Sequence, residues 1–235
     1  MAHFFLDFDY TLGFVTNAID GRIDSLMATV TRTSADIVSK AYDRRTEVGY
    51  SIKNHLESIK ALCGNINFDI EVATTIIIQA LSYEFREILY EDVLNDLEML
   101  KRAGHTYSFV TFGGRDYQFE KLEATGLLDS LGVPNVESYF RIVEGKGGKP
   151  LAIKEIISAL ELHGETLVFV DDKLGELILV REFSKNSGLN ILCVQMVRDH
   201  KRNAADLESG MKVEGEDDEW DGPRVSSVAE LTALV

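Results

Sequence analysis

Hydrophobic residues are spaced in two different ways along the chain, and the spacing changes near residue 92. The first apolar stretch, residues 3–8, is short and predicts a buried strand. Residues 16–90 place apolar side chains at helical spacing and show no convincing strand pattern. Within them, Phe68–Tyr90 contains a β-branched run that could suggest a strand, but we predict a helix there. The predicted buried face of another helix, Ser51–Ala61, consists of Ile52, His55, Leu56 and Ile59.

From residue 92 onward, predicted strands and helices alternate. The strands are Thr106–Thr111, Tyr139–Val143, Thr166–Val170 and Asn190–Met196. The predicted helices are Asp92–Ala103, Arg115–Ala124, Pro150–Leu162 and one between the last two strands. In the first of them, Val93, Leu94, Leu97 and Leu100 point inward. In Pro150–Leu162, Ile153, Ile156, Ile157 and Leu160 lie on one face. Such alternation predicts a parallel sheet covered by helices on both faces.

The predicted fold class is therefore α/β, with a doubly wound, Rossmann-like core and a smaller all-helical domain inserted after the first strand. We expect the core to comprise residues 1–15 and 91–235, and the inserted domain residues 16–90. The chain has 235 residues, 45% of them hydrophobic, which is enough for a sizeable core.

The net charge of the chain makes some classes of binding partner unfavourable. Acidic residues outnumber basic ones by 39 to 24, giving a net charge of -15. Such a surface repels nucleic-acid backbones and anionic membranes, so we expect neither as a partner. It also repels phosphorylated substrates mildly, so a phosphate site would need local positive charge from a metal or a lysine.

Other features point to a cytoplasmic protein. Cys63 and Cys193 lie in apolar surroundings without metal-type spacing, so we expect two reduced, buried thiols. Asp7 interrupts the apolar run Phe4–Leu6, which argues against a signal peptide, and no apolar run approaches the roughly 18 residues of a membrane span. The acidic run Glu214–Asp221 is expected to be a solvated loop, with regulation or partner docking as the alternative.

Candidate chemistry gathers where predicted strands end. These positions hold Asp7 and Asp9, Thr111 followed by Gly113 and Gly114, and Asp171 with Asp172, while Lys149 opens a helix. Taken singly, each acid could be only a helix or turn cap, and the lysine a solvated helix start. In an open parallel sheet, however, ligands and catalytic groups gather at the carboxyl ends of the strands, so the ordered set favours one site.

Such a set suits phosphoryl transfer. Clustered carboxylates need a cation to neutralise them, and oxygen ligands without a His or Cys cluster favour Mg²⁺ over zinc. One carboxylate can attack phosphorus, and a second can move the proton of the leaving group or of water. A hydroxyl, backbone amides and a lysine can hold the charged phosphoryl group.

The motifs together resemble those of the haloacid dehalogenase-like hydrolase superfamily. The first motif, Asp-x-Asp-x-Thr, matches Asp7-Phe8-Asp9-Tyr10-Thr11, although Tyr10 stands where the family often has Gly. The other matches are Thr111 ending a strand, Gly148-Lys149-Pro150 with Lys146 as a competing lysine, Val168-Phe169-Val170-Asp171-Asp172, and a helix with Gln118 and Lys121-Leu122 after the second motif. The resemblance covers about residues 1–13 and 92–235 and implies that 16–90 form a helical cap.

The resemblance also implies roles. Asp7 would be the nucleophile and a Mg²⁺ ligand, and Asp9 the acid/base, with its backbone carbonyl on the metal. Thr111, Gly113 and Lys149 would bind the phosphoryl group, and Asp171 would hold the metal with Asp172 assisting or replacing it. Because family members that cleave carbon–halogen or phosphonate bonds lack the second Asp, Asp9 favours phosphate esters.

We therefore expect a Mg²⁺-dependent phosphatase that acts on a small phosphorylated metabolite, as a monomer or homodimer. Two alternatives stay open: a phosphotransferase or phosphomutase, and a regulatory binding protein with little turnover. Cationic candidates for substrate contacts are Arg22, Arg44, Arg45, Lys53, Arg86 and Arg115, and each could equally be an ordinary surface residue.

Overall fold

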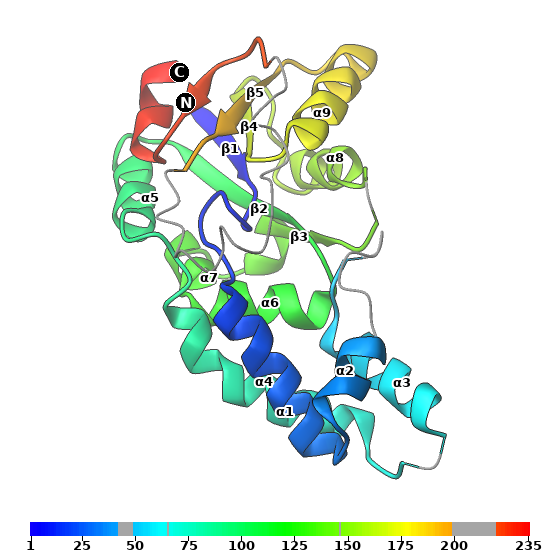
Figure 1. Cartoon of the computed structure of the whole chain (residues 1–235). Helices are drawn as coiled ribbons and strands as arrows, with labels where there is room; N and C mark the ends of the chain where they lie inside the picture. The colour runs from blue at the N-terminus through cyan, green and yellow to red at the C-terminus, as the bar shows by residue number, and fades with distance from the viewer. Residues whose placement is uncertain (42–48, 65, 146, 199–219) are drawn as a thin grey trace.

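The first strand of the chain lies in the centre of a parallel sheet (Figure 1). A computed structural model describes residues 1–41, 49–64, 66–145, 147–198 and 220–235. Within that part, six strands pair in the order β3-β2-β1-β4-β5-β6, and all five pairings are parallel. The strands are β1 (Ala2–Leu6), β2 (Thr106–Phe112), β3 (Phe140–Val143), β4 (Thr166–Asp171), β5 (Ile191–Met196) and β6 (Arg224–Val225). The predicted doubly wound α/β fold is confirmed.

Helices cover both faces of this sheet, so its strands are apolar on both sides. On one face, Phe5 of β1 packs with α8 (Lys149–Ala159) and α9 (Leu174–Ser187). On the other face, Phe4 and Leu6 pack with α5 (Val93–Arg102), α6 (Arg115–Ala124) and α7 (Leu127–Leu131). Two 3₁₀ helices, η1 (Val136–Tyr139) and η2 (Ala229–Leu234), complete the described elements.

Between β1 and α5 the described residues form four helices, which we call the helical insert and which lie below the sheet in Figure 1. They are α1 (Asn17–Thr31), α2 (Ala35–Ala41), α3 (Ile52–Cys63) and α4 (Ile70–Arg86). Side chains of Thr16, Ser51 and Asp69 cap α1, α3 and α4 by accepting backbone N–H bonds. The β-branched run within Phe68–Tyr90 is helical, and the predicted inner face of α3 is buried, so both predictions are confirmed.

The chain enters and leaves the insert through two segments that lie side by side. Phe14 N donates to Ile88 O at 2.9 Å, and Tyr90 N donates to Leu12 O at 3.1 Å. Between them, Gly13 approaches so closely that a Cβ there would lie 2.6 Å from Ile88 O. The segment that carries the first Asp motif is therefore bonded directly to the chain returning from the insert.

A few sequence-based expectations are wrong. Leu94 is 44% exposed, whereas Asp96 is buried because its Oδ2 accepts the Ala229 N–H at 2.9 Å where η2 packs on α5. Cys63, predicted to be buried, is only half-buried because it lies where α3 ends at the surface. Residues 214–219 of the acidic run lie outside the described residues, as does Lys146. No described helix is long and apolar enough to cross a membrane.

Candidate functional site

Three predicted site residues meet at the carboxyl ends of β1 and β4. These strands are neighbours, with Leu6 opposite Val170, so Asp7 and Asp171 emerge next to each other. Lys149, the first residue of α8, donates from Nζ to Asp7 Oδ1 at 2.7 Å and to Asp171 Oδ2 at 2.5 Å. All three side chains are buried, so this is an ion-paired cluster inside the protein.

Negative charge exceeds positive charge in this cluster. Carboxylate oxygens of Asp7, Asp171 and Asp172 lie within 4.8 Å of one another. The Lys149 ammonium contacts two of these acids, and Lys173 supplies a second positive charge near Asp7 and Asp172, so three carboxylates face two ammonium groups. Burial raises the pKa of Asp7 to about 7, with Asp171 adding to the rise and Lys149 opposing it. Burial and the charges of Asp171 and Asp7 raise the pKa of Asp172 well above its usual range. A cation bound here would relieve this repulsion.

Hydrogen bonding distinguishes the two acids at the end of β4. Asp171 accepts from Lys149 on Oδ2 and from the Lys173 N–H on Oδ1, at 2.8 Å. In the described part of the chain, Asp172 Oδ1 is buried without a hydrogen-bond partner. The ranking of these acids as metal ligands stays a prediction, and this arrangement favours Asp172. Carboxylate oxygens alone are the donor set that a hard cation such as Mg²⁺ prefers.

Asp9 does not hydrogen-bond to Lys149 but accepts hydrogen bonds from two side chains of α6. Lys121 Nζ lies 2.5 Å from Asp9 Oδ1, and Gln118 Nε2 lies 2.9 Å from Asp9 Oδ2. Burial would raise the pKa of Asp9, but the charge and hydrogen bond of Lys121 outweigh it and lower the pKa. The sequence marked Gln118 and Lys121 only as part of a helix resembling the family. Their spacing of three residues on a helix beginning just after the second motif was the available signal.

The segment after β2 is closely bonded to its surroundings. The buried Thr111 hydroxyl donates to Gln118 Oε1 at 3.3 Å. The amide of Gly113 donates to Val143 O at 2.9 Å, and that of Gly114 donates to Tyr50 O at 2.8 Å. The expected free amides after Thr111 are therefore engaged in this structure. Phosphate binding by Thr111 and Gly113 stays a prediction. The Gly113 amide could bind phosphate only if its hydrogen bond to Val143 O breaks.

Comparison with known proteins adds a fold-level relation. No family model and no curated protein matches the chain. Among solved structures, the chain is similar to a "putative haloacid dehalogenase-like hydrolase" from Burkholderia xenovorans LB400, with 19% identity, TM-score 0.66 and coverage of 99% of this chain and 95% of that one. It is also similar to a haloacid dehalogenase-like family hydrolase from Xanthomonas campestris (16%, TM-score 0.52, 100% and 94% covered) and a "putative beta-phosphoglucomutase" from Thermotoga maritima (16%, TM-score 0.53, 100% and 98% covered).

The chain has the haloacid dehalogenase-like fold. The resemblance read from the motifs is confirmed at this level, and the match extends over the helical insert as well as the core. Carbon–halogen and phosphate chemistry are both represented among the names of these structures, so the fold leaves the reaction to be argued from the site.

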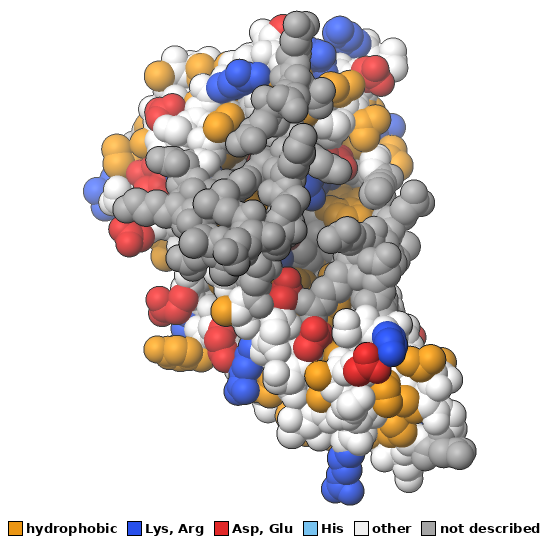
Figure 2. All heavy atoms as spheres, in the orientation of Figure 1, with side chains coloured by type: hydrophobic (Ala, Val, Ile, Leu, Met, Phe, Trp, Pro, Cys, Tyr) orange, Lys and Arg blue, Asp and Glu red, His pale blue; other side chains and the backbone are white. Residues whose placement is uncertain are grey.

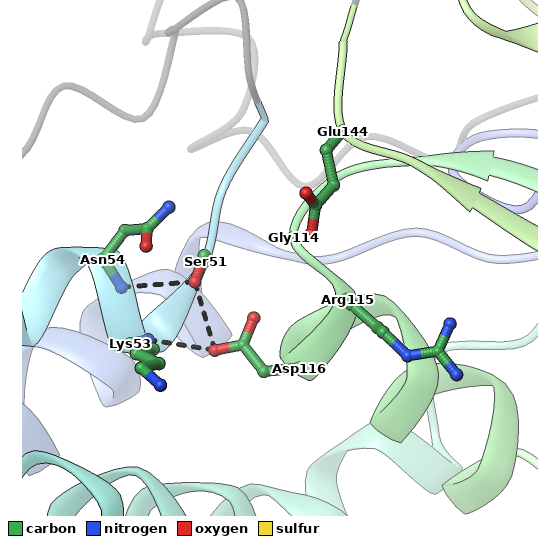
Figure 3. Close-up of a pocket in the computed structure, with 7 residues that line it drawn as sticks. All are labelled: Ser51, Lys53, Asn54, Gly114, Arg115, Asp116 and Glu144. Atoms are coloured by element: carbon green, nitrogen blue, oxygen red, sulfur yellow. Dashed lines mark hydrogen bonds between the residues drawn. The ribbon is translucent and has the colours of Figure 1, made fainter.

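A cavity lies where the haloacid dehalogenase-like core meets the helical insert (Figure 3). Its volume is about 330 Å³, and it is lined by Ser51, Lys53, Asn54, Gly114, Arg115, Asp116 and Glu144. Asp116 holds the start of α3, because its Oδ2 accepts from the Ser51 hydroxyl at 3.2 Å and from the Lys53 N–H at 2.9 Å. In Figure 3 the Arg115 guanidinium extends away from this bonded group.

Two of the cationic candidates on the insert, Arg22 and Lys53, are already paired with acids. Arg22 lies 3.5 Å from Glu84, and Lys53 lies 2.5 Å from Glu71. Arg115 of the core lies 3.6 Å from Glu137. Arg44 and Arg45 lie outside the described residues. Acidic and basic side chains are interspersed over the visible face of the insert in Figure 2, as expected for an ordinary solvated surface.

Proposed function

We propose that this chain is a haloacid dehalogenase-like hydrolase that removes phosphate from a small phosphate monoester, with Asp7 as the nucleophile and Mg²⁺ as the cofactor. The observation that carries the proposal is the buried Lys149 between Asp7 and Asp171, with Asp172 beside them. The arrangement supports the proposal because it brings together a carboxylate that could act as nucleophile, a fixed cation and further carboxylates.

Asp7 and Asp172 would hold Mg²⁺, together with the backbone carbonyl of Asp9. The excess of carboxylates over ammonium groups and the unpartnered Asp172 Oδ1 fit such an ion. When bound, Mg²⁺ supplies positive charge to the oxygens of a phosphoryl group. Lys149 would share that task, because its ammonium already contacts the nucleophile.

The chain's own residues would then perform two steps. An oxygen of Asp7 bonds to phosphorus while the bond from phosphorus to the ester oxygen breaks, and protonated Asp9 gives its proton to that oxygen. Water next attacks the phosphorus of the aspartyl-phosphate, Asp9 takes one proton from the water, and inorganic phosphate leaves. The lowered pKa of Asp9 favours its carboxylate, the form that takes the proton of water in the second step, so Asp9 must gain a proton before the first step.

A small substrate is supported by the helical insert, which we propose acts as a cap that sets substrate choice. The cavity of about 330 Å³ between core and insert has a size suited to the non-phosphate part of a small molecule. Its walls combine amide, hydroxyl and charged groups, so we expect a polar substrate.

The test is a panel of aryl phosphates, sugar phosphates, nucleotides and phosphorylated acids, assayed with and without Mg²⁺, beside a panel of 2-haloacids. We expect phosphate release that EDTA abolishes, and no release by Asp7→Asn. Carrying out the reaction in ¹⁸O-labelled water should place the label in inorganic phosphate, whereas transfer to a second hydroxyl would not. Halide release, or inactivity of the wild-type protein on the whole phosphate panel, would refute the proposal.

A further inference from the structure

The Asp9 carboxylate is held by two side chains of one helix. Lys121 donates to its Oδ1 and Gln118 donates to its Oδ2, and both donors belong to α6. The two donors are 1% and 3% exposed, whereas the Asp9 side chain is 25% exposed. A carboxylate has about four lone-pair sites, so two stay available for water or substrate on the open side. The Asp9 carboxylate is thus fixed by two buried donors on α6 and is accessible to water or substrate on its exposed side.

Lys121 cannot itself reach a substrate in this structure. Its ammonium lies 5.0 Å from the ring centre of Phe8 and 4.8 Å from that of Tyr117, and the side chain is 1% exposed. Burying a lysine costs free energy unless its charge is paired, and the ion-pair partner of Lys121 is Asp9. Its role is therefore exerted through that carboxylate.

Gln118 is fixed in turn by the backbone around it. Its Nε2 also donates to Phe112 O at 2.8 Å, and its Oε1 accepts from the Thr111 hydroxyl. Gly113, with φ +148°, leaves room for the amide, because a Cβ there would lie 2.6 Å from Nε2. Asp9 is thereby linked through one amide to the end of β2, where the phosphoryl group is expected.

The same helix supports the insert on its other side. Asp116 binds the start of α3, Glu120 accepts from the Ser82 hydroxyl of α4 at 2.5 Å, and the Tyr117 ring packs edge-on against Phe85. Asp116 and Glu120 thus face the insert, Gln118 and Lys121 face Asp9, and Tyr117 contacts both Phe85 of the insert and Lys121. The placement of Asp9 is tied to the helix on which the insert rests.

We propose that Lys121 and Gln118 are the positioning residues that hold the Asp9 carboxylate for its proton transfers. This inference rests on the proposed function, since it concerns the proton acceptor of the second step. Without Lys121 the carboxylate can rotate, and misplacement of about 1 Å can cost as much as about 100-fold in rate. We expect hydrolysis of the aspartyl-phosphate to become the slow step.

The experiment is stopped-flow hydrolysis of 4-nitrophenyl phosphate with Mg²⁺ by wild-type protein, Lys121→Met and Asp9→Asn. Since 4-nitrophenolate leaves without needing a proton, the first step should stay near its wild-type rate. For Lys121→Met we expect kcat and KM to fall together by about 10- to 100-fold, kcat/KM to change little, and a burst of about one 4-nitrophenolate per site. On the Asp9→Asn background, the Lys121→Met change should alter kcat less than about twofold, because the positioned group is absent.

The matched control is Lys154→Met, an exposed lysine on α8, which should show wild-type kinetics without a burst. If Lys121→Met does not fold by circular dichroism, Gln118→Met, which removes the second donor, decides by the same readouts. Wild-type kinetics in the variant, or a fall in kcat/KM without a burst, would overturn the inference. Inactivity of the wild-type protein would instead refute the proposed function itself.

Discussion

Replacing Lys149 by Met should destabilise the protein by about 3–5 kcal/mol at pH 8. Methionine keeps most of the side-chain length but removes the ammonium that pairs with both Asp7 and Asp171. Both carboxylates are nearly inaccessible to water, so neither can be hydrated in place of the lost contact. Removing one partner of a buried ion pair costs this much because it leaves uncompensated charge inside the protein.

The cost should depend on pH in a defined direction. Without Lys149, the pKa of Asp7 rises further, so more protons are bound in the folded than in the unfolded state. Stability of the variant must then fall as pH rises, and the difference from wild type should be larger at pH 8 than at pH 5. Added Mg²⁺ should recover part of the loss, because it replaces the missing positive charge.

Urea unfolding followed by circular dichroism measures this effect at both pH values, with EDTA and with Mg²⁺. Lys154→Met is the control, since Lys154 lies on the same helix but is exposed, and it should change the free energy of unfolding by less than about 0.5 kcal/mol. A Lys149→Met effect below about 1 kcal/mol at pH 8, or one that is larger at pH 5, would refute the reasoning.

Three further outcomes follow from the site. With EDTA present, the wild-type protein should lose up to about 4 kcal/mol of stability as pH rises from about 4 to 7, because the folded pKa of Asp7 is raised from 3.8 to about 7. Urea unfolding across that range measures this change, and a gain in stability with rising pH would contradict it. Gly113→Ala should displace Gln118 and lower both activity and melting temperature, whereas Gly21→Ala, with open space around it, should not; equal effects would contradict the stated contact. Asp116→Ala should destabilise the start of α3 by about 1–2 kcal/mol, measured as faster amide hydrogen exchange there than in α9; unchanged exchange would show that Asp116 does not hold it.

Much of the fold could be predicted because local patterns decide it. Each predicted strand is present, because short apolar runs bounded by turn residues have few other places to be buried. The helix through Thr74–Ile78 formed despite its β-branched side chains, since one face of α4 is buried against α1, α3 and α6 and Asp69 caps the start. Leu94 was predicted to be buried but is exposed. The C-terminal segment, distant in sequence, packs on α5 so that Asp96 accepts the Ala229 N–H, which turns Asp96 to the inner face instead.

The site was predictable as a set of residues but not as a set of bonds. The strand order brings Asp7 beside Asp171, and the rule that sites gather at the carboxyl ends of strands located them. The sequence indicated the helix that carries Gln118 and Lys121 but not their bonds to Asp9, because Lys121 lies 112 positions away and no local pattern shows that its ammonium turns inward. Likewise, only the hydrogen bonds of Asp171 distinguish it from its neighbour Asp172.

The central place of β1 has a consequence for how the protein is made. This strand is translated first among the six, and its neighbours β2 and β4 begin about 100 and 160 residues later, delays of roughly 5–20 s and 10–30 s at ordinary translation rates. Until β2 is made, an apolar segment that could join foreign strands has emerged from the ribosome without either partner. Asp7 and Asp9 directly follow it, and charges at such a boundary oppose aggregation. The carboxylates assigned here to chemistry would thus protect the nascent chain before any active site exists.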